Sequence, residues 1–386
     1  MQSSNRKNLL ILSFTLVVVT LGFGLVMPIL PFYMERLGAG GIELGLLVSS
    51  YAVMRLIFGP IWGSLSDRIG RKPILMVGVL GYGITMVGFG LSTQLWMMFL
   101  ARILSGVLSS ATSPTTMAYI SDSTSEDDRG GGMGMLGAAV GLGTIFGPAL
   151  GGLLAEQSLS TPFFAAGGLS LLALILIFIF LPESLQESQL PRGESDQCML
   201  DLRAWWAALF SPTGPLLVMA FIATGGTMIF YGILGLYALE RFGYGTDQVG
   251  LIFMILGLVT AIGQGLLVGP LTRHLGDLNV IKLGFLLSGL SLLPVTVADR
   301  YAPLLLSIGF FSLWNAVLIP AITSLTSKRA TLSQGVTMGL SNSFISLGRI
   351  FGPLLGGLAF DLHWGLPFLC GALVMLIGFF GSLRGR

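Results

Sequence analysis

A ten-residue stretch, GTIFGPALGG from Gly143 to Gly152, returns as GRIFGPLLGG from Gly348 to Gly357, 205 residues later. The same offset relates ERLG at residues 35–38 to ERFG at residues 240–243. A nearly constant offset over half the chain indicates an internal duplication. We therefore expect two similar halves.

Composition places both halves in a membrane. Hydrophobic residues make up 53% of the 386 residues and charged residues only 10%, whereas a soluble domain carries about 25% charged residues. Apolar runs long enough to cross ~30 Å of hydrocarbon recur along the chain, and such runs must be helical because the bilayer core offers the backbone no water. We predict an all-α membrane protein with helices over residues 8–33, 43–66, 74–92, 95–121, 130–156, 161–181, 214–239, 247–272, 279–298, 302–327, 333–361 and 364–382.

A polar stretch over residues 182–213 is expected to be a cytoplasmic linker between an N-terminal half, residues 1–181, and a C-terminal half, residues 214–386. Of the 20 lysines and arginines, Arg55, Arg102 and Arg349 lie deep inside predicted helices, and only Arg36, Arg241 and Arg300 lie in the loops of one side. The remaining basic residues lie on the other side, and an excess of Lys and Arg marks the cytoplasmic side of a membrane. Both termini are therefore predicted to be cytoplasmic.

Three motifs are specific enough to suggest a family. The stretch GSLSDRIGRK at residues 63–72, between the second and third predicted helices, resembles the signature loop of the major facilitator superfamily. RILSG at residues 102–106 resembles the arginine motif of its fourth helix, and the stretch from Gly143 to Gly152 resembles a motif of its drug/proton antiporters. The chain looks most similar to the bacterial multidrug and tetracycline efflux branch. This resemblance implies two six-helix halves that work by alternating access, with a substrate site between them near the midplane.

The motif charges and glycines are candidates for conformational control. Asp67 can accept hydrogen bonds from Arg71 or from a helix N-terminus in the other half, and Asp122 can pair with Arg71 or Arg68. Such a cluster could be a latch that holds one state shut; the alternative is a simple topological anchor. Glycines four residues apart allow close helix approach, and a proline bends a helix; the alternative is ordinary packing. The candidates are Gly63, Asp67, Arg68, Gly70, Arg71, Lys72, Asp122, Gly143, Gly147, Pro148, Gly151, Gly152, Gly352 and Pro353.

The charges inside the predicted helices favour anionic substrates, whereas the family resemblance favours drugs, which are often cationic. All 18 acidic residues fall at helix ends or in loops, and the positions that match the antiporters' membrane carboxylates hold Val19, Tyr231 and Ala316. An arginine at mid-bilayer costs about 3 kcal/mol or more unless it faces water or a partner, and its guanidinium suits carboxylate, phosphate or sulfonate. The uncharged candidates could instead serve packing, Arg102 could have a structural role, and Arg349 could snorkel or cap a broken helix. The candidate substrate-binding or proton-linked residues are Arg55, Arg102, Tyr231, Gln264, Trp314, Asn315, Asn342 and Arg349.

Other classes of protein fit the sequence poorly. There are two histidines and no Ser/His/Asp or Cys/His constellation, Cys198 and Cys370 are far apart, and no phosphate-binding loop occurs. We expect no enzyme activity, metal, cofactor or nucleic-acid partner, and a receptor or channel suits the two-state motifs less well than a transporter does. The leading prediction is a monomer in a bacterial-type inner membrane that exports small amphipathic organic compounds in exchange for protons. The alternative is an organic-anion transporter, by proton symport or facilitated diffusion.

Overall fold

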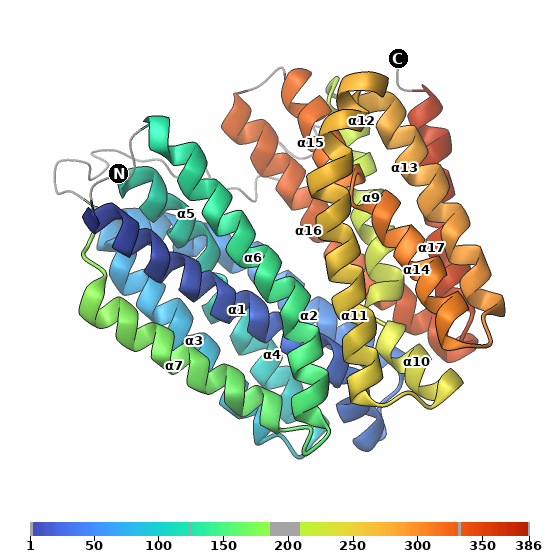
Figure 1. The fold of residues 1–386 in the computed structure, drawn as a ribbon, viewed down its shortest axis with the longest axis horizontal. Helices are drawn as coiled ribbons and strands as arrows, with labels where there is room; N and C mark the ends of the chain where they lie inside the picture. Colours follow the sequence, from blue (N-terminus) through green and yellow to red (C-terminus); the bar gives the residue numbers. More distant parts are fainter. Residues whose placement is uncertain (1–2, 124–125, 186–208, 331–332, 385–386) are drawn as a thin grey trace. The chain divides into compact units, whose positions relative to one another are not determined.

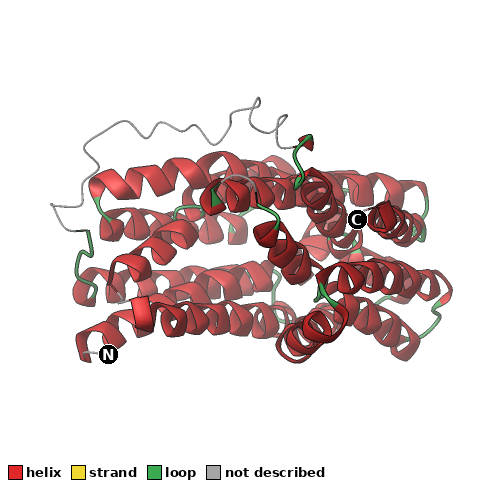
Figure 2. Ribbon diagram, turned by 90° about the horizontal axis from the view of Figure 1, so that it is seen from above, coloured by secondary structure: helices red, strands yellow, loops and turns green. Residues whose placement is uncertain are grey.

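The protein is described from a computed structural model over residues 3–123, 126–185, 209–330 and 333–384. Within these ranges the regular structure is helical (Figures 1 and 2). Twelve helical segments are long and apolar enough to cross a membrane, and their ends lie within three residues of the predicted ones. The prediction of an all-α protein with twelve spans is confirmed.

The first six spans are formed by seven helices. They are α1 (Ser3–Arg36), α2 (Gly41–Ile69), α3 (Arg71–Gly90), α4 (Leu95–Ser109), α5 (Thr112–Ser123), α6 (Glu126–Ala155) and α7 (Thr161–Phe180). The helices α4 and α5 together make the fourth span.

The last six spans are more often interrupted. They contain α9 (Gly214–Tyr231), α10 (Leu234–Phe242), α11 (Thr246–Ile262), the π-helix η2 (Gly263–Leu267), α12 (Val268–Leu275), α13 (Asp277–Leu292), the 3-10 helix η3 (Leu293–Val297), α14 (Tyr301–Asn315), α15 (Leu318–Lys328), α16 (Gln334–Leu362) and α17 (Leu366–Arg384).

Two of the interruptions are related by the duplication. The break between α4 and α5 lies just before Pro114, and the break between α14 and α15 lies just before Pro320. A proline cannot donate to the carbonyl four residues earlier, so each helix is weakened at that point. By contrast, α6 and α16 continue through Pro148 and Pro353, and the predicted bend at these two prolines stays a prediction.

The chain packs as two compact units. Unit 1 comprises residues 1–33, 50–197 and 245–254, and unit 2 comprises residues 34–49, 198–244 and 255–386. The first turns of α2 thus belong to unit 2, and the first turns of α11 belong to unit 1. The division into halves at residues 182–213 stays a prediction, and most of the predicted linker lies outside the described residues.

Each unit has an apolar core of its own. In unit 1, Leu12 of α1, Leu75 of α3 and Ile177 of α7 are buried in one cluster. In unit 2, the ring of Phe230 on α9 lies edge-on to Phe311 of α14, with centroids 4.6 Å apart. These cores hold in place the helices that carry the candidate residues.

Candidate functional site

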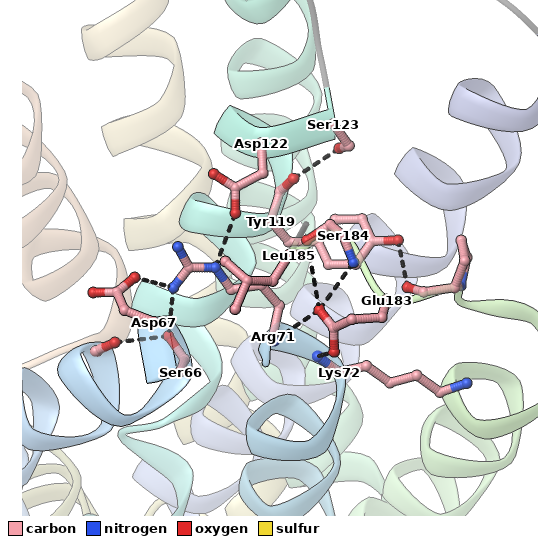
Figure 3. A network of polar contacts seen from close by, with 12 residues as sticks. Ser66, Asp67, Arg71, Lys72, Tyr119, Asp122, Ser123, Glu183, Ser184 and Leu185 are labelled. Atoms are coloured by element: carbon pink, nitrogen blue, oxygen red, sulfur yellow. Dashed lines mark hydrogen bonds and ion pairs between the residues drawn. The ribbon is translucent and has the colours of Figure 1, made fainter. Parts of the chain in front are cut away.

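Arg71 is the centre of a polar cluster between α2, α3 and α5 in unit 1 (Figure 3). Its Nε lies 2.9 Å from Asp122 Oδ2, its Nη1 forms an ion pair with Asp67 Oδ1, and the same Nη1 donates to Ser66 Oγ at 2.8 Å. The Arg71 side chain is buried, whereas 47% of the Asp67 side chain is exposed. The structure thus brings together three sequence candidates, Asp67, Arg71 and Asp122, with Ser66. We name this set of four residues the Arg71 cluster.

The turn between α2 and α3 fixes the position of Arg71. Ser66 Oγ donates to the Gly63 carbonyl at 2.8 Å, and the Gly70 nitrogen donates to the Ser66 carbonyl at 3.2 Å. Gly70 has φ of 119°, a backbone conformation that residues with a side chain rarely adopt. Gly70 is therefore needed for the turn itself, and Gly63 contributes its carbonyl.

Glu183 completes this region and was not a sequence candidate. Its carboxylate accepts hydrogen bonds from the backbone nitrogens of Arg71, at 2.9 Å, and Lys72, at 3.1 Å (Figure 3). These are the first nitrogens of α3, which have no partner inside the helix. Two cations at a helix N-terminus are unfavourable, and the Glu183 carboxylate offsets them. The only feature of the sequence that could have pointed to Glu183 is its position directly after a long apolar run, within the stretch predicted to be a linker.

The remaining loop candidates take different positions. Lys72 Nζ donates to the Phe178 carbonyl at 2.9 Å, so this side chain binds α7. Arg68 is exposed, and Asp122 is paired with Arg71.

The glycines of α6 lie against α1. A Cβ on Gly147 would lie 2.6 Å from the Leu21 carbonyl oxygen, and one on Gly151 would lie 2.6 Å from the Leu25 carbonyl oxygen. A Cβ on Gly143 would overlap the Thr20 side chain. No residue with a side chain fits at these three positions without moving α1.

The duplicated glycines of α16 lie against α9 in the same way. A Cβ on Gly352 would lie 2.7 Å from the Gly225 carbonyl oxygen, and one on Gly356 would overlap the Ile229 carbonyl. The repeated motif therefore places its helix against the first helix of the same half, in each half.

The fourth glycine of each motif contacts a different helix. In unit 1, a Cβ on Gly152 would overlap the Thr246 carbonyl of α11, and a Cβ on Gly250 would lie 2.5 Å from the Pro148 carbonyl oxygen. Thr246 Oγ1 also donates to the Gly152 carbonyl at 3.0 Å.

In unit 2, matching contacts join α16 to the start of α2. A Cβ on Gly357 would overlap the Gly41 carbonyl, and a Cβ on Gly45 would overlap the Pro353 carbonyl. The duplicated stretches thus mark two equivalent places where helix backbones meet almost without side chains between them.

Arg102 occupies the interior of unit 1. Only 2% of the residue is exposed, and its guanidinium lies 4.7 Å from the Tyr51 ring centre and 5.9 Å from the Phe23 ring centre. Its Nε and Nη2 atoms are buried and have no hydrogen-bond partner among the described residues. Contacts with aromatic rings stabilise such a cation, but they leave these two donors unsatisfied.

Arg55 shares the neighbour Tyr51 with this buried cation. It is exposed and interacts with Tyr51, whose hydroxyl is 3.2 Å from Ser109 Oγ. Tyr51 also interacts electrostatically with Arg102. The two arginines and the tyrosine therefore form one basic and aromatic site within unit 1.

The candidates of unit 2 are more scattered. Asn315 Oδ1 accepts a hydrogen bond from Thr227 at 2.9 Å, and the Tyr231 ring packs on Phe230 with centroids 5.0 Å apart. The Trp314 indole nitrogen is buried without a partner in the described part of the chain. Gln264 lies in the π-helix η2, a distortion that is frequent at functional sites. Asn342 and Arg349 of α16 are exposed.

Comparison with known proteins identifies the fold and the family. Residues 12–330, and again residues 216–384, match the family model of the Major Facilitator Superfamily. The chain belongs to the major facilitator superfamily. It is an integral membrane protein with several spans and a transporter of small molecules, as the motif resemblance predicted.

Relatives in this superfamily match nearly the whole chain. Multidrug resistance protein 2 of Bacillus subtilis is 33% identical over 373 residues, which cover 96% of this chain and 92% of that protein. Quinolone resistance protein NorA of Staphylococcus aureus is 28% identical, with 97% and 95% covered. The crystal structure of the human organic anion transporter MFSD10 shares the fold with a TM-score of 0.71, at 22% identity over 99% of this chain and 100% of that one.

The acidic residues of the described spans lie away from the middle of those spans. Every carboxylate that the structure describes in a membrane span lies within a few residues of the end of that span. Two of the positions predicted from the sequence to match the antiporters' membrane carboxylates are Ala316, which is buried, and Tyr231, which packs on Phe230. In the described part of the spans, the polar interior is therefore basic or neutral and contains no acidic group.

Proposed function

We propose that this superfamily member is a proton-coupled exporter of small amphipathic organic compounds. The observation that carries the proposal is the match, over nearly the full chain, to a multidrug resistance protein and to a quinolone resistance protein. Both termini would face the cytoplasm of a bacterial-type inner membrane, because the basic loops lie on one side. The protein would work as a monomer.

In this proposal the Arg71 cluster and the two glycine motifs control the alternation between states. Arg71 can exchange its carboxylate partners Asp67 and Asp122, since Asp67 is about half exposed. The backbone contacts of Gly152 and Gly357 need no side chain to rearrange before the helices separate. A cluster of ion pairs that opens as a unit is a common form of two-state switch.

A second candidate function, transport of organic anions, follows from the charges of unit 1. Arg102 has two donors without a partner in the described residues, and Arg55 is an exposed cation that interacts with the same tyrosine, Tyr51. A carboxylate or sulfonate could accept hydrogen bonds from both guanidinium groups, and an organic cation would be repelled. Proton coupling would then use carboxylates at the ends of the spans.

The test is transport by the purified protein in proteoliposomes with an imposed pH gradient. Ethidium serves as the cationic probe, Nile red, which has no net charge, as the neutral probe, and fluorescein as the anionic probe. Gradient-dependent movement of ethidium or of the neutral dye supports the proposed exporter of amphipathic compounds. Movement of fluorescein alone supports the second function, and movement of none of the three contradicts both.

A further inference from the structure

The turn between α12 and α13 repeats the turn that holds Arg71. Thr272 Oγ1 donates to the Gly269 carbonyl at 3.1 Å, and the Gly276 nitrogen donates to the Thr272 carbonyl at 3.1 Å. Gly276 has φ of 76°. These residues stand 206 positions after the three that build the first turn, Gly63, Ser66 and Gly70. Both turns therefore present the following helix in the same way.

The charged residues of the two turns have opposite signs. The positions 206 residues after Asp67, Arg71 and Asp122 hold Arg273, Asp277 and Lys328. An acid–base–acid set in the first half thus corresponds to a base–acid–base set in the second.

One ion pair of the second set is formed. Lys328 Nζ lies 2.6 Å from Asp277 Oδ2, just as Asp122 pairs with Arg71 in unit 1. The central residue is again buried, with 6% of the Asp277 side chain exposed against 8% for Arg71. A negative charge is favourable at the start of α13 because of the helix dipole, so this helix needs no added carboxylate like that of Glu183.

The other ion pair of the second set is open. Asp277 Oδ1 is buried and has no hydrogen-bond partner in the described residues. Arg273, four positions earlier across the turn, is exposed and has no partner in the described ranges. The equivalent atoms of unit 1, on Asp67 and Arg71, are paired. A buried carboxylate oxygen without a partner is costly, and Arg273, a cation that could satisfy it, stands four residues earlier, before the turn between α12 and α13.

We propose that Arg273, Asp277 and Lys328 form a second ion switch of opposite charge to the Arg71 cluster. Lys328 holds Asp277 in the state described here, and Arg273 moves onto Asp277 Oδ1 in another state of the transport cycle. Asp277 is the positioning residue of the switch, because it orients both cations. This inference rests on the proposed transport function for its second state, and on the geometry alone for the first.

The first arm of the experiment measures thermal unfolding of the purified protein in detergent. We compare Asp277→Asn, Lys328→Gln and Arg273→Gln with each double variant, and His274→Gln is the control because it is the exposed neighbour of Arg273. Since only the Lys328 pair is formed in this state, the effects of Asp277→Asn and Lys328→Gln should be strongly non-additive. Arg273→Gln should change the unfolding temperature no more than His274→Gln does.

The second arm measures the rate of transport of the three dyes by the same variants in proteoliposomes. Arg273→Gln should slow transport about tenfold, the scale of one hydrogen bond between charged groups, while His274→Gln should not. Adding Arg273→Gln to Asp277→Asn should cause no further loss, since the two residues would act together.

The outcomes separate this inference from the proposed function. If Arg273→Gln transports as fast as His274→Gln, or if its effect adds fully to that of Asp277→Asn, the switch is refuted. Additive effects of Asp277→Asn and Lys328→Gln on unfolding refute it as well. If the wild type moves none of the dyes, the proposed function fails, and the unfolding arm still decides whether Asp277 is the centre of an ion pair.

Discussion

The carboxylate of Asp361, near the end of α16, accepts a hydrogen bond of 2.7 Å from the backbone nitrogen of Gly41, the first residue of α2. Its second oxygen accepts one of 2.9 Å from the nitrogen of Ile42. The first backbone nitrogens of a helix have no partner inside it, so α2 receives its N-terminal cap from a residue 320 positions later. This cap lies beside the close contact of Gly357 with Gly41 and strengthens it.

We expect Asp361→Ala to destabilise the protein by about 1–2 kcal/mol, the usual effect of losing a charged cap at a helix N-terminus. The measurement is the unfolding temperature of the purified protein in detergent. Glu156→Ala is a matched control, because Glu156 stands 205 residues before Asp361, is exposed, and makes no hydrogen bond in the described ranges. Equal effects of the two changes would contradict a capping role.

Asp67→Asn should leave the protein folded and inserted and should slow transport about tenfold, because it removes one charged partner of Arg71. Asp299→Asn is the control, since 74% of the Asp299 side chain is exposed and its pairing with Arg300 is loose, at 4.0 Å. Initial rates of dye transport, normalised to the amount of inserted protein, give the comparison. Wild-type rates in Asp67→Asn would reduce the Arg71 cluster to a topological anchor.

Alanine in place of a motif glycine should lower the stability of the protein, whereas alanine in place of a glycine that faces open space should not. Gly151→Ala and Gly352→Ala should each destabilise the protein by about 1–3 kcal/mol, because the new methyl group would meet a backbone carbonyl. Gly141→Ala should be neutral or stabilise it by up to about 1 kcal/mol, because nothing lies within 4 Å of a Cβ at that position. Thermal unfolding checks all three variants. If Gly151→Ala and Gly352→Ala unfold at the wild-type temperature, then α1 and α9 can move away from the added methyl groups at little cost, which contradicts the prediction.

The spans could be predicted from the sequence because a bilayer admits few structures. Twenty apolar residues without water can only be a helix, so hydropathy located every span to within three residues. The Arg71 cluster was predictable in part, since Asp67 and Arg71 are four residues apart across a turn that requires Gly70. The duplication also predicted that Gly352 would repeat the packing of Gly147, and it does.

The polar contacts between distant segments could not be predicted. Glu183 and Asp361 each cap a helix that lies more than a hundred residues away in sequence, and no local pattern marks an acidic residue at a span end as a cap for another helix. The burial of Arg102 against Tyr51 and Phe23 depends on how three helices pack. Composition showed that the arginine must avoid lipid, but the rings that surround it became visible only in the fold.

Arg55 distinguishes the two proposed functions most directly. If it is a counter-charge for anionic substrates, Arg55→Gln should weaken fluorescein transport by about 1.5–3 kcal/mol in kcat/KM, the scale of a hydrogen bond to a charged group. A neutral dye should be spared, and ethidium should be transported better, because part of the selectivity would be repulsion of cations. Arg300→Gln is the control, since 84% of that side chain is exposed. If the protein exports amphipathic cations without using Arg55, the variant should match wild type towards ethidium at every pH gradient. Equal losses for cationic, neutral and anionic dyes would contradict the counter-charge role and leave Arg55 as a support for Tyr51, with which it interacts on α2.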